Sequence, residues 1–293
     1  MTYTIQNEQL TVALQHTGAE LRSLVDNQTR LEYMWSGDPA VWNGVAPNLF
    51  PNVGMLRDSQ TQFDGQTYAL PKHGIVRRSA AWTVVDQSAA AISFAFKASA
   101  ATQAHYPYEF TLFITYRLDG RKLHVIHEVQ NHGATAMPYS LGGHPAFRCP
   151  LRAGETYEAY YLRWPQAETA ATLRLTEDGL INYETVPILD NTDRLPLRHS
   201  LFTDDALIFT DLQSRSVALC HRERGEVLRV EHADFPYLGI WAKTNGDYVC
   251  LEPWIGMADR VDQRGEFAEK EGVRTVAAGE SGVHGYTIIV AEA

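Results

Sequence analysis

The sequence predicts an all-β protein, a large antiparallel sandwich or barrel formed as one domain over residues 1–293. Short runs alternate between apolar and polar residues, and turn residues separate these runs about every ten residues. Periodicity of the helical type is nearly absent. Many short strands joined by regularly spaced turns are typical of a sandwich or barrel.

The elements expected along the chain begin with one short helical turn near Pro39–Asn43. Asp64-Gly65 then lies between two alternating runs and predicts a hairpin. Asp119-Gly120 predicts a second hairpin, because Phe110–Arg117 precedes it and Lys122–Val129 follows it, both in alternation. The remaining strand candidates are Trp82–Val85, Ala91–Phe96, Tyr157–Trp164, Leu207–Asp211, Ser216–His221, Glu226–Glu231, Tyr237–Trp241, Tyr248–Leu251 and Gly285–Val290.

The overall charge and the cysteines exclude several classes of protein. A net charge of −10 argues against a nucleic-acid partner and is compatible with a neutral small substrate. Cys149, Cys220 and Cys250 form no CxxC pair, which gives neither a disulfide framework nor zinc-ligand spacing. We see no signal peptide, and no apolar run approaches the roughly 18 residues of a membrane span. The sequence therefore predicts a cytoplasmic protein with no membrane partner.

Two histidines stand in constrained turns. His144 follows Gly142-Gly143 and precedes Pro145, so the backbone at this bend is tightly specified. A turn that needs only a polar residue more often carries Asn, Asp or Ser, which suggests that this bend serves to direct the His144 ring. His73 lies between Lys72 and a glycine in a similar turn. A structural turn or a solvated loop is the simpler interpretation of each.

Two acidic residues stand at the ends of apolar strands. Glu252 ends one such strand before Pro253, although glutamate is depleted in strands and rarely buried without a partner. Asp205 stands at the start of another, where a solvated turn is the alternative. Trp42, Trp241 and Trp254 offer flat apolar surfaces that suit sugar rings, with core packing as the alternative.

The sequence predicts no metal and no other cofactor. His124 and His127 are three residues apart on a strand, so they face opposite sides and cannot share an ion. No HExxH, serine elbow or phosphate loop occurs. Histidines with a carboxylate, without a metal or nucleophile, suit proton transfer to and from a polar neutral substrate.

Several motifs taken in order resemble those of the aldose 1-epimerase (galactose mutarotase-like) family, in the branch associated with lactose and galactose operons of Gram-positive bacteria. The resemblance covers nearly the whole chain, and it implies a large antiparallel β-sandwich with an open cleft on one sheet. It also implies interconversion of the α and β anomers of free hexoses such as galactose or glucose. The motifs are Gly18–Leu24, Leu49–Gly54, Leu70–Gly74, Tyr106–Phe110, Ser140–Phe147, Asp205–Phe209, Cys250–Trp254 and Gly279-Glu280.

The resemblance assigns roles to individual residues. It implies that Glu252 is the general base and His144 the general acid. His73 then assists at the ring oxygen and hydroxyls, and Asp205 holds a sugar hydroxyl. Arg77 stands where related branches have a binding arginine. The acid must recover its proton, so its pKa should lie near the working pH, as that of an unperturbed histidine does.

Further substrate contacts are expected from two other residues. Trp254 would flank the sugar and, with Pro253, raise the pKa of Glu252. Relatives often have an arginine directly after the glycine of F-P-x-V-G, where this chain has Met55. Arg57, two residues later on the same side of a strand, is the candidate replacement for that hydroxyl contact.

Alternative functions remain open at this point. A hexose-6-phosphate 1-epimerase would use cations such as Arg57, Arg77 and Arg78 at the cleft. A carbohydrate-binding protein without catalysis would show affinity but no turnover. A glycoside hydrolase or lyase would need two catalytic carboxylates, which Asp205 and Glu252 would have to supply. The expected partner is a monosaccharide, and the sequence is compatible with a monomer or a homodimer.

Overall fold

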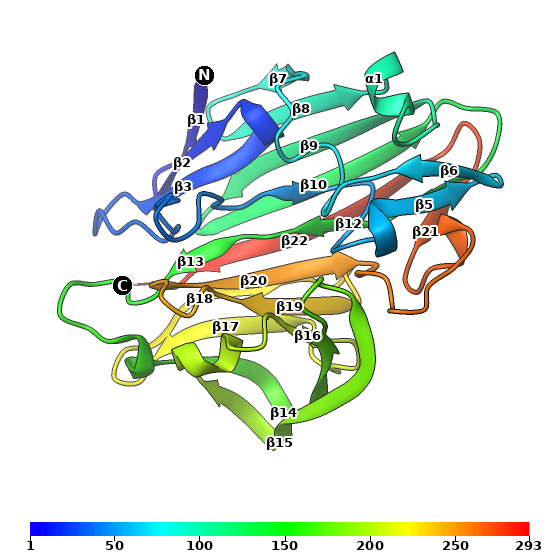
Figure 1. Ribbon diagram of the computed structural model, residues 1–293. Coiled ribbons are helices and arrows are strands. Elements are labelled where there is room, and N and C mark those ends of the chain that lie inside the picture. Colours follow the sequence, from blue (N-terminus) through cyan, green and yellow to red (C-terminus); the bar gives the residue numbers. More distant parts are fainter. Residues whose placement is uncertain (293) are drawn as a thin grey trace.

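The computed structural model describes residues 1–292, and strands dominate it (Figure 1). One antiparallel sheet of 15 strands forms most of the molecule. Along its hydrogen-bonded path lie β4 (Asn48–Leu49), β12 (Leu141–Gly143), β20 (Tyr248–Ile255), β19 (Tyr237–Trp241), β16 (Leu207–Phe209), β14 (Tyr160–Leu175), β17 (Ser216–His221), β18 (Gly225–Glu231), β22 (Ser281–Val290), β10 (Lys122–Asn131), β9 (Phe110–Asp119), β8 (Ala91–Lys97) and β7 (Trp82–Gln87). Two further strands join it: β13 (Ala146–Arg148) pairs with β20, and β15 (Ile181–Pro196) pairs with β14.

Smaller sheets and one helical turn complete the fold. The smaller elements are the sheet β1 (Thr2–Gln6), β2 (Leu10–Gln15) and β3 (Glu20–Asp26), the pairs β5 (Gln60–Phe63) with β6 (Gln66–Ala69) and β11 (Met137–Tyr139) with β21 (Arg274–Val276), and the helix α1 (Ala100–Gln103). The first sheet packs against the long one, because the Tyr3 ring of β1 meets the Phe94 ring of β8 edge-on at 5.4 Å. The Tyr116 hydroxyl donates a 2.8 Å hydrogen bond to the Ala19 carbonyl and fixes this contact.

The predicted all-β class and antiparallel sandwich are confirmed, and so are both Asp-Gly hairpins, which join β5 to β6 and β9 to β10. Residues 39–41 form a turn, as expected. Several boundaries differ from the prediction; for example, β20 continues past Leu251 to Ile255, and β22 begins at Ser281 rather than at Gly285. The strand expected from Tyr157 begins at Tyr160, since Tyr157–Ala159 is a 3-10 turn. The strand expected to reach Asp211 ends at Phe209.

Several parts of the fold were not expected from the residue patterns, among them α1, the second half of β14 and β15. The helix α1 begins where the Ser99 side chain accepts a hydrogen bond from the Thr102 amide and the Thr102 side chain reciprocates, a capping box. β14 continues past Trp164, and β15 pairs along it. β15 contains prolines and many exposed polar residues, which an edge strand tolerates but which hide it from pattern analysis.

Candidate active site

The backbone register of the long sheet places His144 opposite Glu252. β12 and β13 both pair with β20, and their registers match on either side of the gap between them. The bend at His144-Pro145 fills this gap, with the Leu251 amide donating to the Pro145 carbonyl at 3.1 Å and the His144 amide to the Pro47 carbonyl at 3.1 Å. His144 therefore occupies the cross-strand position of Glu252, and its Nε2 lies 3.2 Å from Glu252 Oε2.

Aromatic rings hold the His144 imidazole in place. The Trp42 ring stacks on it at 5.0 Å, and Trp241 meets it edge-on at 5.7 Å. Within residues 1–292, neither His144 Nδ1 nor Glu252 Oε2 has a hydrogen-bond partner, although both atoms are buried. The two side chains thus face each other in a closed, apolar setting, and each keeps an atom that can still form a hydrogen bond.

His73 stands beside this pair with its own ring fixed. Its amide donates to the Gly54 carbonyl at 3.0 Å, and the Gly54 amide donates to His73 Nδ1 at 3.1 Å. Because Nδ1 accepts, the ring carries its proton on Nε2 and can donate it elsewhere. Next in the chain, Gly74 has φ of +77° and lies so close to the Phe50 carbonyl that a Cβ would stand 1.9 Å from that oxygen. Only glycine fits this approach. The His73 and His144 rings lie 5.8 Å apart.

These side chains line one pocket. β20 supplies Glu252 and Trp254, and the turn before β16 supplies Asp205. Asp205 holds a φ of +74°, and its side chain accepts a 2.8 Å bond from the Ala206 amide. The complete lining is Gly54, Lys72, His73, His144, Leu175, Gly179, Asp205, Ala206, Ile208, Glu252, Trp254 and Ala258. β12, β20, β19 and β16, which carry or adjoin most of the site, lie side by side in the sheet (Figure 1).

Burial shifts the pKa values of all three central groups toward their neutral forms. It raises the pKa of Glu252 well above the usual value, and Asp205 adds to the rise. Burial lowers the pKa of His144 to about 3, and it lowers that of His73 well below the usual value. The sequence predicted the direction for Glu252. For His144 the sequence predicted a pKa near the working pH. The structure gives a lower pKa because His144 is only 9% exposed. A charged His144 is stabilised here only together with an ionised Glu252, since each charge offsets the other.

Not every predicted binding residue lines this pocket. Arg77 does not line the pocket but lines two other depressions beside the 71–79 loop. Its charge nevertheless lowers the pKa of both His73 and His144. Arg57 lines a separate depression, and its guanidinium donates to the Gln263 carbonyl at 3.3 Å. Met55 lies next to Gly179 of the pocket lining, since a Cβ added at Gly179 would stand 3.7 Å from the Met55 Cβ.

Two residues of the site were not predicted. Lys72 lines the pocket and has no ion-pair partner among residues 1–292. Its charge lowers the pKa of both Glu252 and His144. Cys250 lies beneath the pair, and its sulfur is within 4.8 Å of ligand atoms of His144 and Glu252. The sequence could have indicated Cys250, because it stands two residues before Glu252 on the same strand and such residues share a face. These three residues are also the ones within the described chain that are placed to hold a metal ion.

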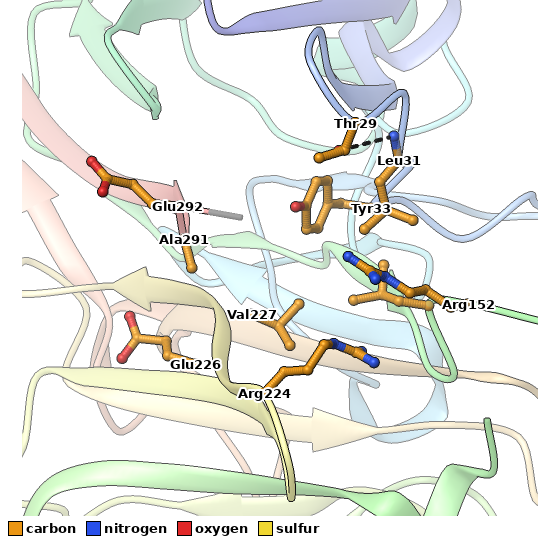
Figure 2. A pocket seen from close by; sticks show the side chains of 10 residues that line it. Thr29, Leu31, Tyr33, Arg152, Arg224, Glu226, Val227, Ala291 and Glu292 are labelled. Carbon is orange, nitrogen blue, oxygen red and sulfur yellow. Dashed lines mark hydrogen bonds between the residues drawn. The ribbon is translucent and has the colours of Figure 1, made fainter.

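A second depression shares no residue with this pocket (Figure 2). Its ten lining residues include Tyr33, Arg224 and Glu226 but no histidine. Arg224 is paired with Glu155, and Glu226 accepts from Arg163 at 2.8 Å. Arg224 and Glu226 are therefore engaged with neighbours, and the ten lining residues include no acid–base pair of the kind formed by His144 and Glu252.

The fold and this site place the chain in a known class of protein. The sequence profile of the family described as aldose 1-epimerase matches residues 1–274, and the chain belongs to that family. It is 36% identical over 299 residues to the LacX (plasmid) protein of Lactococcus lactis subsp. lactis, and 35% identical to the chromosomal LacX of the same organism. Each comparison covers 99% of both chains.

Two solved structures are similar over the full length. The galactose mutarotase related enzyme of Lactobacillus acidophilus has a TM-score of 0.93 at 31% identity, covering 100% of this chain and 98% of that one. A galactose mutarotase-like protein of Lactobacillus casei has a TM-score of 0.92 at 29% identity, covering 99% of this chain and 100% of that one. Within residues 1–292, no helix has the length and apolar character needed to cross a bilayer.

Proposed function

We propose that this protein is an aldose 1-epimerase that interconverts the α and β anomers of a free hexose such as galactose or glucose. The observation that supports this most directly is the His144–Glu252 pair, 3.2 Å apart at the floor of a pocket that His73 also lines. Mutarotation needs one group to take a proton and one to give a proton at neighbouring oxygens, and it needs no metal or covalent nucleophile.

The reaction divides between the two members of the pair. Glu252 accepts the proton of the C1 hydroxyl while His144 donates its proton to the ring oxygen. The bond between C1 and the ring oxygen breaks, and an open-chain aldehyde forms. After rotation about the C1–C2 bond, the C5 hydroxyl attacks the opposite face of C1. His144 then recovers its proton from that hydroxyl, and Glu252 returns its proton to the C1 oxygen, so both groups end as they began.

The surrounding residues bind and orient the sugar. His73 donates from Nε2 to a sugar oxygen, and Asp205 accepts from a hydroxyl at the opposite wall. The Trp254 indole offers an apolar surface to the ring; it lies against Gly142 and Gly239, where a Cβ would come within 2.8 and 2.5 Å of it. Arg77 acts through its charge on the two histidines rather than as a lining residue.

Polarimetry on freshly dissolved α-D-galactose and α-D-glucose tests this proposal directly. We expect the approach to anomeric equilibrium to accelerate in proportion to enzyme concentration, beyond the spontaneous rate. Sugar binding without any acceleration would instead identify a carbohydrate-binding protein without catalysis. Release of a second sugar from a glycoside would identify a hydrolase and overturn the assignment of Asp205 as a binding residue.

A second candidate substrate is a hexose 6-phosphate. The observation in its favour is Lys72, which lines the pocket without an ion-pair partner among residues 1–292 and shares its loop with Arg77 and Arg78. The net charge of −10 opposes it, because an acidic protein repels an anionic substrate at long range. Including glucose 6-phosphate in the polarimetry separates the two: a kcat/KM higher than that for glucose would favour the phosphorylated sugar.

A further inference from the structure

A thiol, an imidazole and a carboxylate meet beside the pocket, where the buried Cys250 lies next to the lining residues His144 and Glu252. Cys250 Sγ, one ring nitrogen of His144 and one carboxylate oxygen of Glu252 lie within 4.8 Å of one another. Cys250 and Glu252 point to the same face of β20, and the β12–β13 bend brings His144 across from them. The arrangement is therefore fixed by the sheet rather than by mobile side chains.

The ligand atoms of this cluster are available to a ligand. Glu252 is 1% exposed, and its Oε2 has no hydrogen-bond partner within residues 1–292. His144 makes no side-chain hydrogen bond in that range either, and only the contact with Glu252 engages its ring nitrogens. Cys250 is a free cysteine. Buried polar groups without partners are costly, so a bound ion that engaged them would be stabilised.

The chemistry of the three donors selects the kind of ion. Zinc binds sulfur at about 2.3 Å and imidazole nitrogen or carboxylate oxygen at about 2.0–2.2 Å, commonly with three protein ligands and one open position. Atoms within 4.8 Å of one another need to move inward by about an ångström or less to meet such an ion. Magnesium and calcium prefer six or more oxygen ligands and do not match this set.

We propose that His144, Cys250 and Glu252 form a binding site for a thiophilic divalent cation of the zinc type, which blocks the pocket reversibly. On binding, a metal–sulfur bond replaces the S–H bond of Cys250, and the thiol proton passes to solvent. The open coordination position faces the pocket, where water fills it. The ion is thus an inhibitor and not a cofactor, because it engages both residues assigned to proton transfer. The binding is independent of the proposed function, whereas the inhibition rests on it.

Spectroscopy with Co²⁺ and dialysis with Zn²⁺ test the binding on the full-length protein. We expect one Zn²⁺ per chain and a Co²⁺–thiolate absorption band that Zn²⁺ displaces. Cys250→Ala should abolish the band and weaken Zn²⁺ binding by at least about tenfold, because one of three ligands is lost. Cys149→Ala and Cys220→Ala are matched controls, since both cysteines are buried and free but lie outside the cluster. Both should keep the band. If Cys250→Ala does not fold, Cys250→Ser takes its place in the same measurements.

Polarimetry in the presence of Zn²⁺ tests the inhibition. The wild-type rate should fall with Zn²⁺, recover with a chelator and stay unchanged with Mg²⁺. In Cys250→Ala, half-inhibition should require at least about tenfold more Zn²⁺, relative to that variant's own metal-free rate. A missing thiolate band, a band that survives Cys250→Ala, or equal Zn²⁺ sensitivity of both proteins would overturn the proposal. A Cys250-dependent band in a protein without mutarotase activity would uphold the site and count against the function alone.

Discussion

Glu252 is the residue on which the proposed reaction depends most. A carboxyl group that is 1% exposed loses most of its hydration, which raises its pKa and makes its ionised form a stronger base. The facing imidazole compensates that charge from 3.2 Å without a lysine or arginine in direct contact. Lys72 moderates the effect from the pocket wall, since its charge lowers the pKa of Glu252.

A variant in which residue 252 cannot accept a proton should therefore lose most of its turnover. Glu252→Gln keeps the shape and the hydrogen-bonding capacity, so we expect kcat to fall by about 10²-fold or more while sugar binding is largely kept. His144→Asn should reduce kcat similarly, because the ring oxygen then leaves without its proton. The double variant should lose less than the two losses combined, as residues that act as a unit are not additive. Polarimetry and calorimetric sugar binding measure both quantities.

The control for these variants is Glu226→Gln, which alters a carboxylate that pairs with Arg163 on a strand outside the pocket. Its kcat should equal that of the wild type. Near-normal turnover of Glu252→Gln would show that the base is elsewhere, and Asp205 would be the first residue to examine, since it also lines the pocket.

Met55 stands where the family resemblance predicts an arginine, and in the structure it lies beside Gly179, which lines the pocket. A Cβ at Gly179 would stand 3.7 Å from the Met55 Cβ and 3.9 Å from Lys72 Nζ, so the side chains of Met55 and Lys72 flank the same turn. Met55→Arg should change KM for galactose or glucose and leave the free energy of unfolding within about 0.5 kcal/mol. Val85→Arg, on an exposed part of β7, is the control. Unchanged sugar kinetics in a folded Met55→Arg protein would place residue 55 outside the binding site.

The candidate residues that the sequence offered were those whose type conflicts with their setting. A glutamate at the end of a predicted apolar strand and a histidine between glycine and proline are both unusual, and the structure brings them together with His73 and Asp205 in one pocket. Lys72 and Cys250 escaped notice because a turn lysine and a strand cysteine are ordinary in their settings. Arg57 was placed on a strand by alternation, but residues 57–59 form a 3-10 turn that directs its side chain toward Gln263.

At the scale of elements, one tight contact between two loops determines the position of His73. Gly74 pairs with Phe50, whose carbonyl accepts from the Ile75 amide at 2.9 Å. The same two loops exchange the hydrogen bonds between Gly54 and His73. His73 is therefore oriented by backbone geometry, and that geometry requires the glycine at position 74.

Gly74→Ala should separate these loops. The new Cβ would meet the Phe50 carbonyl at 1.9 Å and would also have to adopt a φ of +77°. We expect a loss of about 2–5 kcal/mol in the free energy of unfolding, together with a lower kcat, because His73 is displaced. Gly65→Ala is the matched control: its φ is +74°, but nothing lies within 4 Å of the new Cβ. Its cost should be about 1–2 kcal/mol, with activity unchanged. Urea unfolding that gave equal losses for both variants would contradict this account.

Elements with a strong local signal could be predicted, and those defined by distant partners could not. Asp-Gly turns between alternating runs identified the β5–β6 and β9–β10 hairpins, since both the turn and the alternation are local. β15 is polar, contains prolines and has no local signal; only pairing along β14 makes it a strand. The gap between β12 and β13 is likewise visible only once both strands pair with β20.

At the scale of the whole molecule, the large core buries histidines as well as carboxylates, and this makes the fold sensitive to acid. His127 on β10 is fully buried, and burial lowers its pKa to about 3, with His284 adding to the effect. Burial raises the pKa of Glu155, but hydrogen bonds from Arg224 and Tyr160 outweigh that effect and lower it to about 2. Both shifts mean that the unfolded chain binds more protons than the folded one at low pH.

The free energy of unfolding should accordingly fall in two stages as the pH decreases. For a group whose folded pKa is depressed, stability is lost as the pH falls from the unfolded pKa toward the folded one. The His127 contribution therefore declines from about pH 6.5 toward pH 3, and that of Glu155 from about pH 4.5 toward pH 2. Each unmatched proton contributes a slope of about 1.4 kcal/mol per pH unit. Urea unfolding at intervals between pH 7.5 and 3.5 measures the slope in each range.

His127→Leu measures the share of His127 in the upper stage, to which His73 and His144 also contribute. This variant should be less stable than the wild type at pH 7, because it loses the contact of His127 with Asn48 and the ring packing against Tyr286. Between pH 6.5 and 4.5, however, its slope should be shallower by up to about 1.4 kcal/mol per pH unit, since the unfolded chain then has one fewer site to protonate. His132→Gln, which alters an exposed histidine, is the control. An unchanged slope in His127→Leu would mean that His127 does not contribute to the acid sensitivity in this range.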